Sequence, residues 1–154
     1  MRGYCGVGIY RTKNEINVGT LWRSAHSFGA DFIFTVGRRY KQQASDTTKA
    51  WRHVPLFHFA DYDDLLAHLP HDCRIVGVEL SPRAAPVTGY THPLRACYLL
   101  GAEDTGLPPP VLQRVHDLIE IPGLLHCLNV ATAGSIVLYD RARKFNRLER
   151  LEAA

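Results

Sequence analysis

The sequence predicts an α/β fold in which a mostly parallel sheet is flanked by helices. Two runs, Cys73–Leu80 and Ala96–Leu100, are apolar enough for strands that are buried on both faces of a parallel sheet. Segments with helical spacing of apolar residues alternate with such runs, and this alternation favours parallel βαβ units. Hydrophobic residues make up 46% and charged residues 21% of the chain, so residues 1–154 are expected to form a single globular domain.

The first part of the chain is predicted to form a strand, a helix and a second strand. Cys5–Tyr10 is a short apolar run, and Asp31–Val36 is another. Between them, Ile16–Phe28 has apolar residues at helical spacing, and Gly29 is the expected helix stop. That apolar face contains Val18, Leu21, Trp22, Ala25 and Phe28. The polar segment Gly37–Pro55 shows little periodicity, and connections of that length usually carry a function.

The rest of the chain is predicted to add further strands and helices. Besides the two apolar runs above, Leu56–Phe59 and Leu118–Ile121 are predicted strands. Ser81–Pro93 is rich in Pro and Gly and is predicted to be a loop. The predicted helices are Asp61–Leu69, with acidic residues in its first turn, Pro108–Val115, with prolines at its start, and Leu128 to about Leu151.

The apolar stripe on the final helix and two aromatic residues in the basic segment bear on function. The final helix carries a stripe that either packs into the core of this chain or forms an interface between two copies, and the sequence leaves both open. This stripe consists of Leu138, Ala142, Phe145 and Leu148. Tyr40, which lies among cations, is a candidate for stacking on a nucleic-acid base. Trp51 is expected in the core, and stacking on a base beside Arg52 is the alternative for it.

The net charge is +3, and the cations concentrate in two stretches of the chain. The first contains Arg38, Arg39 and Lys41, together with Lys49 and Arg52. The second contains Arg141, Arg143, Lys144, Arg147 and Arg150. Clustered cations suit a phosphate backbone, so Arg38, Arg39 and Lys41 are candidate nucleic-acid contacts; a solvated loop and a solvated helix face are the alternative.

The cysteines and the N-terminus bear on metal binding and location. No two of Cys5, Cys73, Cys97 and Cys127 stand at C-x-x-C spacing, so no zinc site or redox pair is indicated and no metal is expected. The first three lie in apolar runs and are expected to be buried thiols. The first residues lack the apolar core of a signal peptide, and no apolar run approaches the length of a membrane helix. We therefore expect a cytoplasmic protein that does not bind a membrane.

Three blocks near the end of the chain have the form of a nucleotide-binding site. The first block, Leu99–Leu107, is an apolar strand that runs into a loop with Gly101, Glu103 and Gly106. The second is Ile121–Gly123, and the third is the polar turn Cys127–Ala131, which opens the last helix. Ligands of parallel sheets bind beyond the carboxyl ends of strands, where free backbone groups read an adenine edge and a ribose.

These blocks, with Asn17 and Arg23, resemble the motifs of the SPOUT superfamily of RNA methyltransferases, in its SpoU/TrmH ribose 2′-O branch. The Asn17–Arg23 pair resembles the first family motif, and Gly101, Glu103, Gly106 and Leu107 resemble the second. The third motif is matched by Ile121, Pro122, Leu128, Asn129 and Val130. Cys127 and Ala131 depart from the serines that are common in the family, and Ala131 removes one hydroxyl.

The resemblance implies a C-terminal trefoil knot and a homodimer whose active site draws on both subunits. It also implies that S-adenosylmethionine is held in the knot, largely by backbone groups. The residues expected to bind this cofactor are Leu80, Gly101, Ile121, Leu128 and Val130. The implied substrate is RNA, with transfer RNA expected ahead of ribosomal RNA, and no separate RNA-binding domain is expected.

The same resemblance implies the catalytic residues Arg23, Asn17, Glu103 and Asn129. The family assigns its arginine the role of general base, but a guanidinium does not readily lose a proton. We therefore expect Arg23 to hold the phosphate beside the reacting ribose and to stabilise the alkoxide. Asn17 is expected to orient Arg23 or Glu103, and Glu103 to fix Arg23 or Asn17. Asn129 is expected to cap the last helix and to bond into the site.

Three alternatives remain at this point. An enzyme of the same fold could methylate a base instead of a ribose. A protein that keeps the fold but has lost activity would bind RNA without catalysis, an alternative that Cys127 and Ala131 keep open. A small-molecule methyltransferase would not need the basic residues Arg38 and Arg39.

Overall fold

The computed structural model describes residues 3–41, 49–124 and 127–149, and its centre is one parallel sheet. The seven strands lie in the order β3-β2-β1-β6-β4-β7-β5, and every neighbouring pair runs parallel. Their bounds are β1 Tyr4–Tyr10, β2 Phe32–Val36, β3 Leu56–Phe59, β4 Arg74–Val78, β5 Ala85–Pro86, β6 Arg95–Leu100 and β7 Asp117–Glu120. The predicted α/β fold with a parallel sheet is therefore confirmed.

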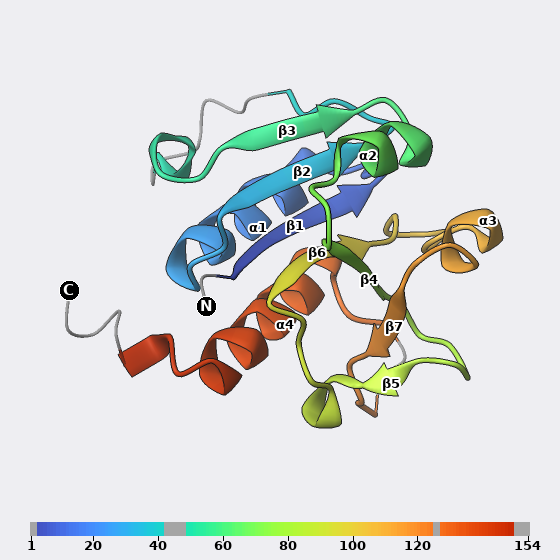
Figure 1. Ribbon diagram of the computed structural model, residues 1–154. Helices are drawn as coiled ribbons and strands as arrows, with labels where there is room; N and C mark the ends of the chain where they lie inside the picture. Colours follow the sequence, from blue (N-terminus) through green and yellow to red (C-terminus); the bar gives the residue numbers. More distant parts are fainter. Residues whose placement is uncertain (1–2, 42–48, 125–126, 150–154) are drawn as a thin grey trace.

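Helices cover both faces of this sheet (Figure 1). The helices α1 (Glu15–Ser27) and α4 (Val130–Lys144) pack against each other and share the larger core cluster. The shorter helices α2 (Tyr62–His68) and α3 (Pro109–Leu112) belong to the cluster on the opposite face. Two short 3-10 turns, η1 (Ala50–Arg52) and η2 (Val87–Gly89), complete the described elements. No helix among the described residues is long and apolar enough to cross a membrane.

The sheet order brings four strand ends together at its carboxyl edge. Strand β6 lies between β1 and β4, and β7 lies on the other side of β4. In the register of these strands, Leu100 pairs with both Ile9 and Val78, and Val78 also pairs with Ile119. The strands β1, β6, β4 and β7 therefore end at nearly the same level, so the loops that follow them meet at one place.

Several predicted boundaries differ from the structure. The final helix ends at Lys144 instead of continuing to Leu151, because Phe145 forms its C-cap and Asn146 has a φ of 52°, which is left-handed. Leu151 itself lies outside the described residues. The predicted helix Pro108–Val115 is only one turn, and the predicted loop Ser81–Pro93 contains β5 and η2.

The prediction that Trp51 packs into the core was wrong. Its side chain is 45% exposed, and the Arg52 guanidinium lies 5.1 Å from the centre of its ring. The neighbouring Ala50 takes the buried position of this short turn. Tyr40 packs edge-on against Trp22, with ring centres 5.8 Å apart, so its ring contributes to packing within the chain.

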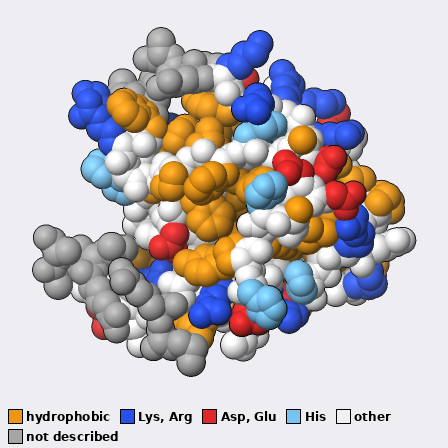
Figure 2. All heavy atoms as spheres, turned by 45° about the horizontal axis from the view of Figure 1, so that its top comes forward, with side chains coloured by type: hydrophobic (Ala, Val, Ile, Leu, Met, Phe, Trp, Pro, Cys, Tyr) orange, Lys and Arg blue, Asp and Glu red, His pale blue; other side chains and the backbone are white. Residues whose placement is uncertain are grey.

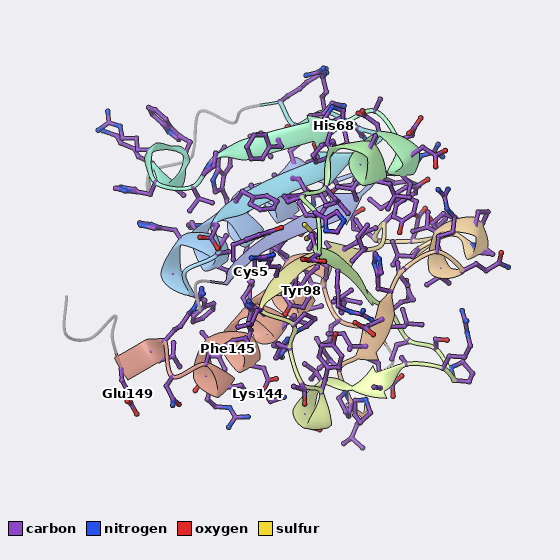
Figure 3. All side chains as sticks on the ribbon, in the orientation of Figure 1. Cys5, His68, Tyr98, Lys144, Phe145 and Glu149 are labelled. Carbon is purple, nitrogen blue, oxygen red and sulfur yellow. The ribbon has the colours of Figure 1, made fainter. Side chains whose placement is uncertain are left out.

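The first half of the apolar stripe on the final helix packs into the core of its own chain. Leu138 and Ala142 are both buried and belong to the core cluster, whereas Phe145 and Leu148 are half-buried. The end of the helix is fixed by polar contacts: the Lys144 ammonium donates to the carbonyls of Val87 and Tyr90 at 2.7 and 2.9 Å. Figure 3 shows Lys144 at this end of α4, beside η2.

The cysteines are free, and three of them are buried, as the sequence predicts. Cys5, Cys73 and Cys97 lie in the core, whereas Cys127 is exposed. Among the described residues, no group of three or more His, Cys, Asp or Glu side chains is arranged to hold a metal ion.

Candidate functional site: a pocket at the carboxyl edge and a polar cluster beside it

A pocket of about 350 Å³ lies where the loops after β4, β6 and β7 meet the beginning of α4. This volume is within the range of small-ligand sites, roughly 300–1,000 Å³. Backbone near the strand ends and apolar side chains form much of its wall. All five residues that the sequence predicts as cofactor contacts line it: Leu80, Gly101, Ile121, Leu128 and Val130.

Two glycines allow the loop after β6 to form one wall of the pocket. A side chain at Gly101 would place its Cβ 2.3 Å from the carbonyl carbon of Gly106, so the loop closes on itself only with glycine there. Gly106 has a φ of +63°, and a Cβ at that position would lie 2.3 Å from Oε2 of Glu79. Both glycines are therefore required by the close approach of other groups of the chain, and of the two only Gly106 has a positive φ.

Glu79 holds this loop from the neighbouring strand end. It follows β4, and its Oε2 accepts a hydrogen bond from the backbone N–H of Leu107 at 2.8 Å. Its Oε1 accepts a second one from the N–H of Leu80 at 3.2 Å. The carboxylate thus connects the ends of β4 and β6. Sequence reasoning missed Glu79 because the residue was counted within the apolar run Cys73–Leu80.

Glu103 is the centre of a polar cluster beside the pocket. Its Oε1 accepts hydrogen bonds from the Thr12 hydroxyl at 2.8 Å and from the Asn17 amide at 2.8 Å. The backbone N–H groups of Asn14 and Lys13 donate to its two oxygens at 3.2 and 2.9 Å. The carboxylate therefore fixes the loop after β1 and the start of α1 against the loop after β6. Thr12 and Lys13 are further residues of this cluster that the sequence did not indicate.

The pKa of Glu103 reflects these contacts. Partial burial acts to raise the pKa, but the hydrogen bonds from the Lys13 N–H, the Asn17 amide and the Thr12 hydroxyl outweigh it. The balance lowers the pKa of Glu103 to about 2, so the side chain is a carboxylate at neutral pH. A carboxylate of this acidity is a weak base, and its role in the cluster is to accept hydrogen bonds.

Asn17 and Asn129 continue the cluster from Glu103 to the start of α4. The Asn17 side chain is buried, and its Oδ1 accepts a hydrogen bond from the Asn129 amide at 3.0 Å. Asn129 is the N-cap of α4, as predicted: its Oδ1 accepts from the N–H groups of Ala131 and Thr132 at 2.9 and 3.1 Å. Every polar atom of the two amides that faces the cluster has a defined partner, so neither amide can flip without losing hydrogen bonds.

Arg23 lies apart from these three residues. Its side chain is exposed, and among the described residues it has no hydrogen-bond or ion-pair partner. Six helical positions separate it from Asn17, which is about 9 Å along the axis of α1 and on a different side of the helix. The expected contact between Glu103 and Arg23 is not present in this chain, since Glu103 is bonded to Asn17 and its neighbours.

The predicted RNA contacts lie just beyond the end of β2. Arg38, Arg39 and Lys41 are all exposed, and the backbone N–H of Lys41 donates to Glu15 at the start of α1. Figure 2 shows Lys and Arg side chains gathered along the upper edge of the face that it presents, around hydrophobic side chains. Because β2 is parallel to β1, these cations lie at the same edge of the sheet as the pocket.

Comparisons with known proteins agree with this fold. The model of the SpoU rRNA Methylase family matches residues 5–139. The tRNA (guanosine(18)-2'-O)-methyltransferase of Escherichia coli (strain K12) is 28% identical over 133 residues, which is 83% of this chain and 58% of that protein. This chain belongs to the SpoU rRNA methylase family.

Two solved structures show the same fold. One, described as giving structural insights into the 2-OH methylation of C/U34 on tRNA, has a TM-score of 0.81 and 23% identity and covers 95% of this chain and 99% of its own. The other is an AdoMet-bound rRNA methyltransferase from Sinorhizobium meliloti, with a TM-score of 0.79 and 25% identity, covering 94% of this chain and 57% of its own. The chain thus spans little more than half the length of the Escherichia coli and Sinorhizobium meliloti relatives.

Proposed function

We propose that this protein is an S-adenosylmethionine-dependent methyltransferase that methylates a ribose 2′-hydroxyl in RNA, with transfer RNA ahead of ribosomal RNA. One observation carries the proposal: the pocket at the carboxyl edge lies directly beside the cluster of Glu103, Asn17 and Asn129. Glu103 belongs to both, since it also lines the pocket. Membership of the SpoU family and the names of its relatives support the same reaction.

The size and the lining of the pocket suit this cofactor. Gly101 and Gly106 both line the pocket and carry no side chain that would cover the backbone of their loop. Leu80, Ile121 and Leu128 supply the apolar surface for an adenine ring. The substitution at Ala131 leaves the cap of α4 intact, because the group that bonds Asn129 is the backbone N–H. The presence of Asn17, Arg23, Glu103 and Asn129 together supports catalysis over the inactive RNA-binding alternative.

The residues of the cluster have positioning roles in this proposal. When bound, S-adenosylmethionine supplies a methyl group on a sulfonium. Asn17 and Asn129 hold the beginnings of α1 and α4 at the pocket, and Glu103 holds both against the loop after β6. Arg23 binds the phosphate beside the reacting ribose and stabilises the charge that develops on the 2′-oxygen. Arg38, Arg39 and Lys41 bind the RNA backbone further from the reacting nucleotide.

The position of Arg23 supports a homodimer with a shared active site. An exposed arginine that lies away from the pocket of its own chain can act there only if a second copy presents it. Exposed apolar side chains on α1 and α4, Ile16 at 65% and Tyr139 at 48% exposure, are candidates for that contact. In the same proposal, the C-terminal segment of the chain threads through a loop and forms a trefoil knot.

The remaining parts of the proposal concern the domain and its location. Residues 1–154 are proposed to act as one methyltransferase domain, which the near-complete overlap with a solved relative supports. The free cysteines suit a reducing compartment, and we propose the cytoplasm.

The experiment is methyl incorporation from labelled S-adenosylmethionine into unmodified transfer-RNA transcripts and, separately, ribosomal-RNA transcripts, followed by digestion to nucleosides and mass analysis. A 2′-O-methylated nucleoside that disappears with Arg23→Ala supports the proposal. A base-methylated product would assign the alternative reaction. Absence of incorporation together with absence of cofactor binding would assign the inactive RNA-binding protein. A rate on RNA that is unaffected by loss of both Arg38 and Arg39 would remove their role in docking.

The shared site has its own test by complementation. Inactive Arg23→Ala protomers are mixed with inactive Glu103→Ala protomers under conditions that exchange subunits. If the site takes Arg23 from one copy and Glu103 from the other, each mixed dimer contains one intact site and activity returns. If both residues act within one chain, the mixture stays inactive and the shared site is wrong.

A further inference from the structure

The pocket contains one carboxylate whose charge is not used by the fold. Four acidic residues line the pocket, and no Lys or Arg is among the described lining residues. A site with this charge balance favours a ligand that carries positive charge. The partners of the four carboxylates decide which of them is available to a ligand.

Three of these carboxylates already have partners within the chain. Glu103 accepts hydrogen bonds from the cluster around Asn17. Asp104 forms an exposed ion pair with Lys13. Glu79 accepts two backbone N–H groups that hold the loop after β6. These three carboxylates therefore hold the loops of the pocket through contacts within the chain.

Glu120 differs from the other three acidic residues because its carboxylate has no partner among the described residues. It is the last residue of β7, its side chain is half-buried, and it lines the pocket one residue before Ile121. Among the described residues its carboxylate has neither a hydrogen-bond partner nor an ion-pair partner. A partly desolvated carboxylate without a partner is costly, and a cation bound beside it offsets this cost.

We propose that Glu120 binds a cationic group on the aminoalkyl arm of the cofactor. This inference rests on the proposed function, because S-adenosylmethionine carries two such groups, the sulfonium and the α-ammonium. Glu120 is thus a specificity-determining residue that favours the charged donor over uncharged nucleosides of the same shape. Glu79 lines the same pocket, yet its two backbone contacts assign it to the loop.

The test compares three ligands by titration calorimetry on the full chain and on Glu120→Gln. S-adenosylmethionine has both cations, S-adenosylhomocysteine keeps only the ammonium, and 5′-methylthioadenosine has neither. Gln keeps the size and the acceptor oxygen but removes the charge. Loss of a partly exposed charged contact is expected to weaken S-adenosylmethionine about five- to tenfold. The affinity for 5′-methylthioadenosine should change less than about twofold, since it has no cation to lose.

The S-adenosylhomocysteine arm identifies the cation. Weakening equal to that of S-adenosylmethionine assigns the ammonium, and an unchanged affinity assigns the sulfonium. Glu149→Gln is the matched control: it makes the same change in net charge on an exposed residue outside the pocket, at the C-terminal end shown in Figure 3. Its affinities should equal those of the unsubstituted chain. The melting temperature of Glu120→Gln should not fall, because no described residue of the fold depends on that carboxylate and the substitution removes an unpartnered charge.

Two results would overturn the inference while leaving the proposed function in place. Equal weakening of all three ligands would mean that Glu120 contacts the nucleoside, which they share. Unchanged affinity for all three would mean that the carboxylate does not reach the ligand. If the unsubstituted chain binds none of them, both the inference and the proposed function are wrong.

Discussion

Substituting Asn17 by Asp places a second carboxyl group within hydrogen-bond distance of Glu103. The Asn17 amide donates to Glu103 at 2.8 Å and its oxygen accepts from Asn129 at 3.0 Å. An ionised aspartate at this position would replace the donated hydrogen bond with repulsion between like charges. A protonated one reproduces the amide, because its O–H donates to Glu103 and its C=O accepts from Asn129. We therefore expect Asn17→Asp to fold with one proton shared by the two carboxyl groups.

The magnitude follows from the cost of that proton. Keeping a carboxyl with an ordinary pKa near 4 protonated costs about 4 kcal/mol at pH 7 and about 1.5 kcal/mol at pH 5. The folded variant thus binds one more proton than its unfolded chain over this range. The pKa of the carboxyl that holds the shared proton is raised in the folded state, so the variant is more stable at low pH and loses stability as the pH rises. The loss relative to the unsubstituted chain should therefore be about 4 kcal/mol at pH 7 and about 1.5 kcal/mol at pH 5.

Urea unfolding at pH 7 and at pH 5 measures this difference. The matched control is Asn14→Asp, the same change three residues earlier, where the side chain caps α1 by accepting from the N–H of Ile16 and is exposed. An Asp there keeps the acceptor and suits a helix N-terminus, so its stability should change by less than about 1 kcal/mol at either pH. If Asn17→Asp is as stable as the control at pH 7, or loses as much at pH 5 as at pH 7, the reasoning about the cluster is wrong.

Three further predictions address the loop after β6, the stability of the fold at acid pH and the RNA contacts. Gly106→Ala puts a Cβ 2.3 Å from Glu79 at a φ of +63°, so it should lower the free energy of unfolding by about 1–3 kcal/mol and weaken cofactor binding. The control is Gly19→Ala in α1, which has open space around it and should be neutral or stabilising in thermal unfolding. Because the pKa of Glu103 is lowered to about 2, the stabilisation of the fold by its carboxylate should be complete above about pH 4.5 and disappear as the pH falls toward 2. In acid titrations, the stabilities of the unsubstituted chain and of Glu103→Ala should therefore converge near pH 2, and a difference that stays constant with pH would contradict this prediction. Loss of Arg38 and Arg39 together should reduce the slope of log affinity against log salt for RNA by about 1–2, and an unchanged slope would show that they do not touch phosphate.

Most of the fold was predictable because its elements have local signals. The apolar strands and the face of α1 from Val18 to Ala25 were predicted within a residue or two, since burial and helical spacing are visible in the sequence. The strand β5 was missed because two residues, Ala85 and Pro86, carry no periodic pattern. The final helix was predicted too long because its apolar stripe continues to Phe145 and Leu148, past the point where Asn146 turns the chain.

The candidate site divides in the same way. Gly101, Ile121, Leu128 and their neighbours were predicted to share a site, and they line one pocket. Glu79, Thr12 and Glu120 were not predicted, because a carboxylate at a strand end or a hydroxyl after a strand has no pattern that distinguishes it from an ordinary surface residue. Only the tertiary structure reveals that Glu79 and Thr12 hold the loops and that Glu120 lines the pocket.

The sequence by itself determined the fold class, the three motif blocks Leu99–Leu107, Ile121–Gly123 and Cys127–Ala131, and the polar residues of the family motifs, because each of these depends on neighbours within about a dozen residues. The tertiary structure decided which polar groups share hydrogen bonds. Asn17 is separated by 86 and 112 positions from its partners Glu103 and Asn129. The pairing of β1 with β6 brings Glu103 to it, and the packing of α4 against α1 brings Asn129 to it. The tertiary structure also decided that Arg23 is exposed and apart from that cluster. Six positions along α1 place Asn17 and Arg23 on different sides of the helix, and the packing of α1 determines which side faces the cluster.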